Sequence, residues 1–159
     1  MKQMIKALLS LAFLAPFVLG TSEGRYSDYY PVYMERKTLE KSVFYTDESR
    51  ELQNPGKVYA KGATLFVNER YKGIHVIDNT DPANPVRKGF VVAPGCIDIA
   101  VKDNILYLDN SVDLVAFDLV AKRETKRIVN ALPEPCAPNG RRSYEERPEN
   151  YVLVEWIKQ

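Results

Sequence analysis

The middle of the chain carries one sequence pattern twice, with the copies about forty residues apart. Residues 58–68 align with residues 99–109 at an offset of 41, and apolar, lysine, turn and aromatic positions coincide. After a loop that is one residue shorter in the second copy, residues 74–78 align with residues 114–118 at an offset of 40. Such a repeat decides the architecture, because each copy is one structural unit that must bury its apolar face against a neighbour.

Each copy reads as short apolar or β-branched runs separated by turn formers, which is typical of antiparallel strands joined by hairpins. We expect strands over residues 57–60, 64–68, 74–78 and 90–92, and again over residues 97–101, 105–109, 114–119 and 126–130. Four strands in about forty residues is the size of a propeller blade. The sequence therefore predicts an all-β protein with antiparallel blade-like sheets, about two propeller-type repeats that make a partial or incomplete propeller.

The flanks do not repeat this pattern, and they divide the rest of the chain. Residues 21–56 form a polar, tyrosine-rich lead with a short helix expected around residues 35–41. Residues 57–130 hold the two repeats, 57–95 and 96–130, and residues 131–159 form a proline-rich loop followed by an alternating strand. Because closed propellers need about four blades or more, we expect both flanks to act as caps, with the last strand covering an exposed sheet edge.

The amino terminus has the layout of a secretory signal peptide. Lys2 and Lys6 precede an apolar run over residues 7–19, and small or polar residues follow from Gly20. As a helix this run reaches only ~20 Å against a hydrocarbon core of roughly 30 Å, which is short for a transmembrane span. We expect residues 1–20 to be removed and the protein to be exported to the periplasm, the cell surface or the medium. An uncleaved signal is the alternative, and would be the only attachment to a membrane.

Charge and cysteine content narrow the classes of partner and site. Removal of residues 1–20 takes two of the 22 basic residues and none of the 21 acidic ones, leaving a net charge of about −1, which gives no support for nucleic-acid binding. Export would permit the only two cysteines, Cys96 and Cys136, to form a disulfide. The alternative is two buried thiols that act as small apolar side chains.

Candidate catalytic and metal-binding residues are few. His75 is the only histidine, so a histidine cluster for zinc is excluded, and its place in an apolar strand favours a packed or edge-facing side chain. Asp78 and Asp81 could bind calcium, but short side chains before prolines also accept backbone hydrogen bonds in turns, which is the interpretation we prefer. Glycine-rich phosphate loops are absent from the sequence. We predict no catalytic residue and no cofactor.

Four further aspartates raise the question of a hydrolase that uses paired carboxylates. These are Asp98, Asp109, Asp113 and Asp118. Aspartates at strand ends are common for structural reasons, and nothing in the sequence singles out a pair.

One stretch of the first repeat resembles a known family. Gly73, Ile74 and Asp78, followed by Asp81-Pro82 and Asn84-Pro85, resemble the signature of the LVIVD repeat family, in which a glycine, an apolar strand and an aspartate precede such a turn. Residues 29–118 are also similar to exported LVIVD-repeat proteins of the Bacteroides group. The resemblance implies a β-propeller-like protein on a cell surface and implies no activity. The second repeat keeps the strand but has residues 120–123 in place of the proline turn.

These observations favour an exported, non-enzymatic binding or interaction module of the bacterial cell envelope, since loops on a rigid β scaffold suit recognition. The expected partner is a protein or a glycan at the cell surface, of unknown identity. Two alternatives stay open: an envelope hydrolase or lyase that depends on carboxylates, and a structural subunit that completes its sheet against a second copy, as a homo-oligomer, or against a larger partner.

Overall fold

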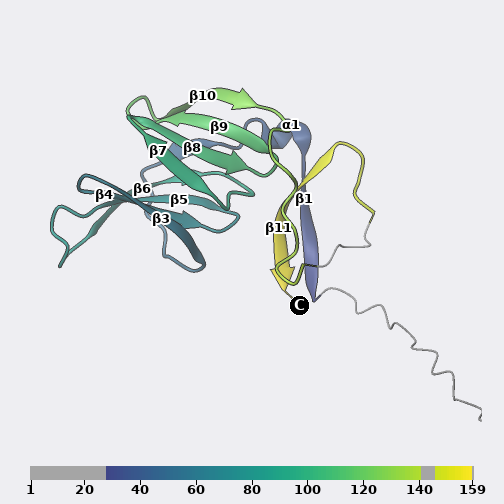
Figure 1. Ribbon diagram of the computed structural model, residues 1–159, viewed down its shortest axis with the longest axis horizontal. Helices are drawn as coiled ribbons and strands as arrows, with labels where there is room; N and C mark the ends of the chain where they lie inside the picture. The colour runs from purple at the N-terminus through teal and green to yellow at the C-terminus, as the bar shows by residue number, and fades with distance from the viewer. Residues whose placement is uncertain (1–27, 141–145, 159) are drawn as a thin grey trace, which may run out of the picture.

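The computed structural model describes residues 28–140 and 146–158, which are almost entirely β (Figure 1). The expected signal peptide, residues 1–20, lies outside the described residues. The elements in chain order are β1 Tyr29–Glu35, α1 Arg36–Leu39, β2 Phe44–Thr46, β3 Pro55–Lys61, β4 Thr64–Glu69, β5 Gly73–Asp78, β6 Val86–Val92, β7 Ile99–Lys102, β8 Ile105–Asn110, β9 Asp113–Asp118, β10 Arg123–Ile128 and β11 Tyr151–Lys158. Among the described residues, no helix is long and apolar enough to cross a membrane.

The strands form three antiparallel sheets, none of which closes on itself. The first repeat makes a five-stranded sheet in the order β2-β6-β5-β4-β3, and the second makes a four-stranded sheet in the order β10-β9-β8-β7. The eight strands expected in the repeats are all present, with ends that differ by a few residues. The prediction of an all-β, incomplete blade-like fold is confirmed.

The flanking strands take places that the sequence analysis did not assign. β2 pairs with β6, with Phe44 opposite Val92, and so adds a fifth strand to the first repeat. β11 pairs with β1, with Tyr30 opposite Ile157, in a separate two-stranded sheet. The prediction that the last strand covers a sheet edge of the repeats is therefore wrong. That strand is held instead by a partner in the tyrosine-rich lead, and Val152 and Val154 pack with Leu39 of α1 in a small core of their own.

The main core lies between the two repeat sheets, which stack face to face with β3 near β7 and β2 near β10 (Figure 1). Side chains alternate between the two faces of a strand, so every second residue points into this core. Phe66, Ile74 and Val91 enter it from the five-stranded sheet, and Leu106 and Phe117 enter it from the four-stranded sheet. Full burial of each such side chain contributes about 1.5–3 kcal/mol, so each repeat is stabilised mainly by the other.

The outer face of the five-stranded sheet is covered by the chain itself. Val67, His75 and Phe90 lie in one row across this face, and all three are buried. Residues 47–54, which connect β2 to β3, contact this face. The guanidinium of Arg50 lies 4.6 Å from the centre of the Phe90 ring. This sheet therefore has a neighbour on each of its faces.

Candidate functional site: the open face of the second repeat

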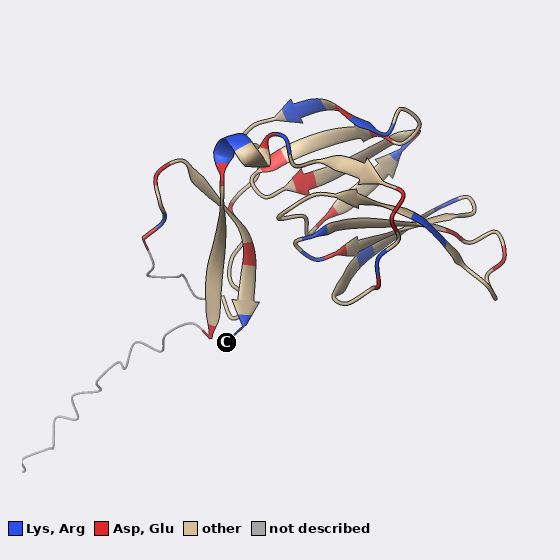
Figure 2. Ribbon diagram, turned by 180° about the vertical axis from the view of Figure 1, so that it is seen from behind, with Lys and Arg blue, Asp and Glu red and all other residues tan. Residues whose placement is uncertain are grey.

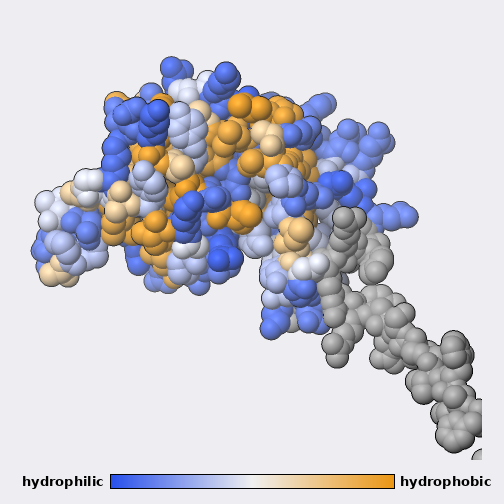
Figure 3. Space-filling model, viewed as in Figure 1, coloured by the Kyte–Doolittle hydropathy of each residue, from blue (hydrophilic) through white to orange (hydrophobic). Residues whose placement is uncertain are grey.

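Apart from Leu132, Pro133 and Pro135 at one end, the described residues place no such cover over the outer face of the four-stranded sheet. We call this surface the open face and define it by residues at facing positions of its four strands: Ala100, Tyr107, Leu114, Ala116, Lys126 and Ile128. Tyr107 is 37% exposed and Ile128 is 49% exposed, whereas the alternate residues Leu106 and Val115 are fully buried in the main core. Figure 3 shows apolar side chains gathered over this region of the molecule.

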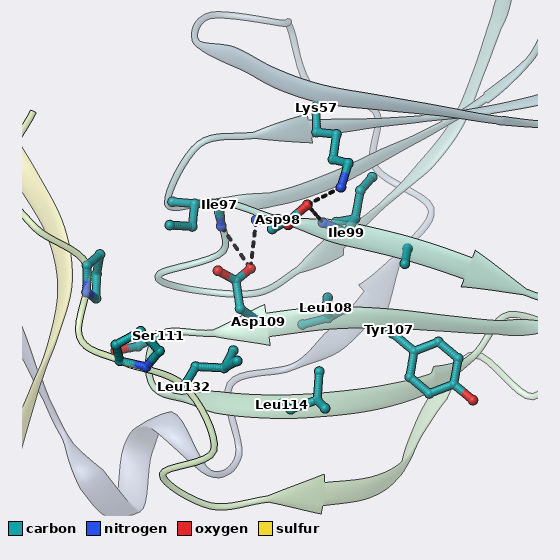
Figure 4. Close-up of a pocket in the computed structure, with 13 residues that line it drawn as sticks. Lys57, Ile97, Asp98, Ile99, Tyr107, Leu108, Asp109, Ser111, Leu114 and Leu132 are labelled. Atoms are coloured by element: carbon teal, nitrogen blue, oxygen red, sulfur yellow. Dashed lines mark hydrogen bonds and ion pairs between the residues drawn. The ribbon is translucent and has the colours of Figure 1, made fainter.

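A pocket of about 310 Å³ lies at one end of the open face (Figure 4). Its walls are mostly apolar and include Ile97, Leu114, Leu132, Pro133 and Pro135, the last three from the segment that follows β10. This volume is at the lower end of the range for small-ligand pockets, roughly 300–1,000 Å³, and it suits one or two apolar side chains.

An ion pair marks the rim of this pocket. Lys57 Nζ lies 2.6 Å from Asp98 Oδ1, and the contact joins the edge of the five-stranded sheet to the start of β7 (Figure 4). The hydrogen bond from Lys57 lowers the pKa of Asp98, and the Ile99 N–H, which also donates to this carboxylate, acts in the same direction. Asp98 is thus ionised and already partnered.

Asp109 is the second carboxylate of the pocket, and it is buried. Its Oδ1 atom accepts hydrogen bonds from the backbone N–H groups of Ile97 and Asp98, both at 2.9 Å (Figure 4). Burial raises the pKa of Asp109 above its ordinary value, against the lowering effect of these hydrogen bonds. Of the four aspartates, the structure therefore brings Asp98 and Asp109 into one pocket.

Glu69 makes the corresponding backbone hydrogen bonds in the first repeat. It accepts hydrogen bonds from the N–H groups of Gln53 at 3.1 Å and Asn54 at 2.5 Å, and His75 Nε2 lies 3.1 Å from it. In both repeats a carboxylate at the end of the second strand holds two consecutive N–H groups of the segment that leads into the first strand. This shared arrangement gives Asp109 a structural role that needs no ligand.

The remaining two aspartates are also used by the fold. Asp113 is fully buried and binds Arg36 at 2.7 Å and Arg127 at 2.8 Å, so that it ties α1 to β9 and β10. Asp118 accepts hydrogen bonds from the N–H groups of Val120 and Ala121, both at 2.8 Å. Neither of these carboxylates lines the pocket.

The two candidate calcium-binding residues, Asp78 and Asp81, accept hydrogen bonds from within the turn that contains them. Asp78 Oδ1 accepts hydrogen bonds from the N–H and the hydroxyl of Thr80, and Asp78 Oδ2 lies 3.4 Å from Lys88 Nζ. Asp81 accepts hydrogen bonds from Ala83 N–H and from the Asn84 side chain. Within the described part of the chain, no three His, Cys, Asp or Glu side chains are grouped closely enough to hold a metal ion.

The family-like signature also has a structural explanation at each end. Gly73 has a φ of +143°, and a Cβ atom there would lie 2.0 Å from the Val91 carbonyl oxygen, so only glycine fits where β5 begins against β6. Ile74 is fully buried in the main core. Pro82 and Pro85 belong to the same turn as Asp81, where Asn84 N–H donates to the Asp81 carbonyl at 3.0 Å.

The two cysteines are both free in this structure, so no Cys96–Cys136 bridge is formed. Cys96 is fully buried, and burial raises the pKa of its thiol well above the ordinary value. Cys136 is exposed in the segment that follows Pro135. Of the two alternatives from the sequence, the buried thiol describes Cys96 and does not describe Cys136.

Residues on the open face were not predicted from the sequence. The available signal was that both faces of the second repeat are apolar: Leu106, Leu108 and Val115 point one way, and Ala100, Tyr107 and Leu114 point the other way. A sheet that is apolar on both faces needs two neighbours, and residues 28–140 and 146–158 supply one. Comparison with models of protein families, with curated proteins and with solved structures gives no match.

Proposed function

We propose that this protein is an exported, non-enzymatic binding module of a bacterial cell envelope, and that it binds a protein or a glycan of the cell surface on its open face. One observation carries the proposal: the outer face of the five-stranded sheet is covered by residues 47–54, whereas the outer face of the four-stranded sheet is largely apolar, carries a pocket and has no comparable cover among the described residues. Contiguous exposed apolar surface rimmed by polar groups is typical of interaction sites.

The proposed location depends on the amino-terminal pattern and on the resemblance to the LVIVD repeat signature over residues 73–85. Both support export and a place in the cell envelope. The blade-like architecture adds support for a binding role, because stacked sheets hold loops and faces rigidly for recognition.

Catalysis by carboxylates is the second candidate, and one observation favours it. Asp98 and Asp109 lie in the same pocket, and their pKa values are moved in opposite directions, as in pairs that divide the roles of base and acid. Against this, Asp98 is held by Lys57, and Asp109 has the structural role that Glu69 has in the first repeat. Turnover of a glycan or peptide that is abolished by Asp109→Asn in a folded protein would establish the enzyme instead.

The test of the binding proposal is an array of cell-surface glycans and of random peptides, probed with the purified protein and with two variants. Leu114→Glu places a charge at the wall of the pocket, and Val86→Glu places the same charge at an exposed position on β6. We expect every specific signal to fall at least tenfold in Leu114→Glu and to persist in Val86→Glu, with all three proteins melting cooperatively. Equal signals from all three proteins would contradict the proposal.

A further inference from the structure

We propose that the open face binds an extended, acidic segment of another polypeptide that places an apolar side chain in the pocket. The inference rests on the proposed function and names the chemistry of the partner. Three features carry it: the charges on the open face, their distance from the pocket, and the poor fit of the face to a second copy of itself.

The charges on the open face are mainly positive. Lys126 lies in one cross-strand row with Ala116, Tyr107 and Ala100, and Lys102 projects from the same side of the sheet as Ala100. Both lysines are exposed, and neither has a carboxylate within ion-pair distance in the described structure. In the ribbon of Figure 2, the positions of basic residues along β10 are blue.

The acidic groups of this face already have partners. The hydrogen bonds from the Ala121 and Val120 N–H groups lower the pKa of Asp118, and Arg123, which lies opposite on β10, acts in the same direction. At the pocket end, Asp98 is paired with Lys57, and Asp109 accepts hydrogen bonds from two backbone N–H groups. The open face therefore offers two free ammonium groups to a ligand and no free carboxylate. Charge complementarity selects a partner with negative charge.

The pocket and the lysines lie at separate positions along the strands. Ile128 is beside Leu114 at the pocket end, Lys126 is two residues further along β10, and Lys102 lies level with Asp118, four residues beyond Leu114. At about 3.3 Å per residue, four residues span ~13 Å. The two lysines lie on opposite edge strands of this sheet, β10 and β7, which are three strand spacings or ~14 Å apart. An extended segment of about five residues that runs over β8 and β9 therefore lies between them, with one apolar side chain at the pocket and carboxylates two and four positions away directed to the two sides.

A polypeptide fits this surface better than an acidic sugar. The pocket walls are mostly aliphatic and proline side chains, and among the pocket residues Tyr107 alone has an aromatic ring. The polar side chains of the lining, which are Lys57, Asp98, Asp109 and Ser111, already bond to other groups of the chain. An apolar side chain of a peptide fills such a pocket, whereas sugar hydroxyl groups buried there would find few hydrogen-bond partners.

A second copy of this chain fits poorly in either orientation. If two open faces met pocket to pocket, the basic residues Lys102, Arg123 and Lys126 of each copy would face one another, and like charges opposed across an interface are destabilising. If one face were reversed, the lysines of each copy would lie against the mostly apolar pocket of the other, where Asp98 is already paired with Lys57 and Asp109 already accepts hydrogen bonds from two backbone N–H groups. An acidic segment avoids both costs.

The test is selection of random heptapeptides on three purified proteins: wild type, a reversal variant with Lys102→Glu and Lys126→Glu, and a control variant with Arg87→Glu and Lys158→Glu. The control changes two exposed basic residues, on β6 and β11, and so matches the change in net charge. We expect wild type and the control to enrich the same peptides, with an apolar residue two to four positions from Asp or Glu. The reversal variant should lose these peptides and enrich Lys and Arg instead.

A second measurement quantifies the charge dependence on one enriched peptide. Replacement of its Asp and Glu residues by Asn and Gln should weaken binding to wild type at least tenfold, and the loss should be small for the reversal variant. Enriched peptides without acidic residues, or the same peptides from wild type and the reversal variant, would overturn the inference.

The failures of the inference and of the proposed function are distinguishable. If neutral glycans or apolar peptides bind and only Leu114→Glu abolishes their binding, the open face is a binding site but its ligand is not an acidic segment. If an anionic glycan binds and needs both lysines, while acidic peptides fail to bind, the ligand of the open face is a glycan and not a polypeptide. If no bound probe responds to Leu114→Glu, both proposals fall.

Discussion

Glu69 and Asp109 show how one structural task is met by two different carboxylates. Each accepts hydrogen bonds from two consecutive backbone N–H groups, but their electrostatic surroundings differ. Burial acts to raise the pKa of Glu69, and the hydrogen bonds from Gln53 and Asn54 and the nearby His75 together outweigh it, so its pKa lies below the ordinary value. At Asp109 burial prevails and the pKa is raised.

This difference predicts unequal effects of removing the two charges. At pH 7 we expect Glu69→Gln to destabilise the fold by about 1–3 kcal/mol, because charged hydrogen bonds are lost at a buried site, and Asp109→Asn to cost less, because the charged form is disfavoured there. Denaturant unfolding measures both, with exposed Glu51→Gln as the control. An Asp109→Asn variant that is less stable than Glu69→Gln would contradict this account.

The dependence of stability on pH follows from the same pKa directions. The pKa of Glu69 is lower in the folded than in the unfolded state, so its contribution is present above the ordinary value of 4.5 and is lost as the pH falls through the folded value. The destabilisation by Glu69→Gln should therefore shrink in unfolding experiments below pH 4.5. The raised pKa of Asp109 acts with the opposite sign, and Asp109→Asn should gain stability relative to wild type as the pH rises above the ordinary value.

At the scale of elements, the short helix α1 depends on one ionic network for its place. Arg36 of α1 binds both oxygens of Asp113, at 2.8 and 2.7 Å, and Arg127 of β10 binds the same carboxylate at 2.8 Å. Asp113 also accepts a hydrogen bond from Asn130 N–H at 3.0 Å. Burial acts to raise the pKa of Asp113, but these partners outweigh it and the pKa is lowered.

Removal of this charge should be far more costly than removal of an exposed one. Asp113→Asn leaves the mostly buried guanidinium of Arg127 with one carboxylate fewer, and we expect a loss of about 3–5 kcal/mol. Glu40→Gln removes the exposed partner of Arg36 and should cost less than about 0.5 kcal/mol. Equal unfolding midpoints for the two variants would show that the network does not hold α1 in place.

The elements that could be predicted from the sequence are those with a repeated pattern. Apolar runs such as Leu106 and Leu108 in β8 recur at the repeat offset, and the turns between them contain glycine, asparagine or aspartate. β1 and β2 have no such copy, and each is specified by a partner far away in the sequence, Leu153 opposite Tyr33 and Val91 opposite Tyr45. Local patterns contain no information on these pairings, so the tyrosine-rich lead did not read as strands.

The candidate site was less predictable than the fold, for a related reason. Asp98 and Asp109 could be named from the sequence, but their places beside one pocket depend on the strand register and on the segment around Leu132. Tyr107 is exposed because no other element packs on its face of the four-stranded sheet in the described structure. Which face of a sheet is covered depends on the packing of the whole molecule, so local sequence does not reveal it.

At the scale of the whole molecule, the two repeats differ in their outer faces. The five-stranded sheet is closed off by residues 47–54, with Arg50 over Phe90 and the N–H groups of Gln53 and Asn54 bound to Glu69. The four-stranded sheet ends in the open face and its pocket (Figures 3 and 4). The outer face of the five-stranded sheet is thus closed to further packing, and the outer face of the four-stranded sheet is open to a partner. This arrangement suits a binding module.

In solution the open face should be free for another molecule, and the solution mass of the purified protein shows whether it is. Light scattering after size exclusion, on wild type and Leu114→Glu at micromolar concentration, gives the number of chains in the particle. We expect the mass of one chain for both proteins, with the same cooperative melting. A discrete oligomer of the wild type that Leu114→Glu converts to a single chain would contradict this expectation, because the open face would then be occupied by a second copy.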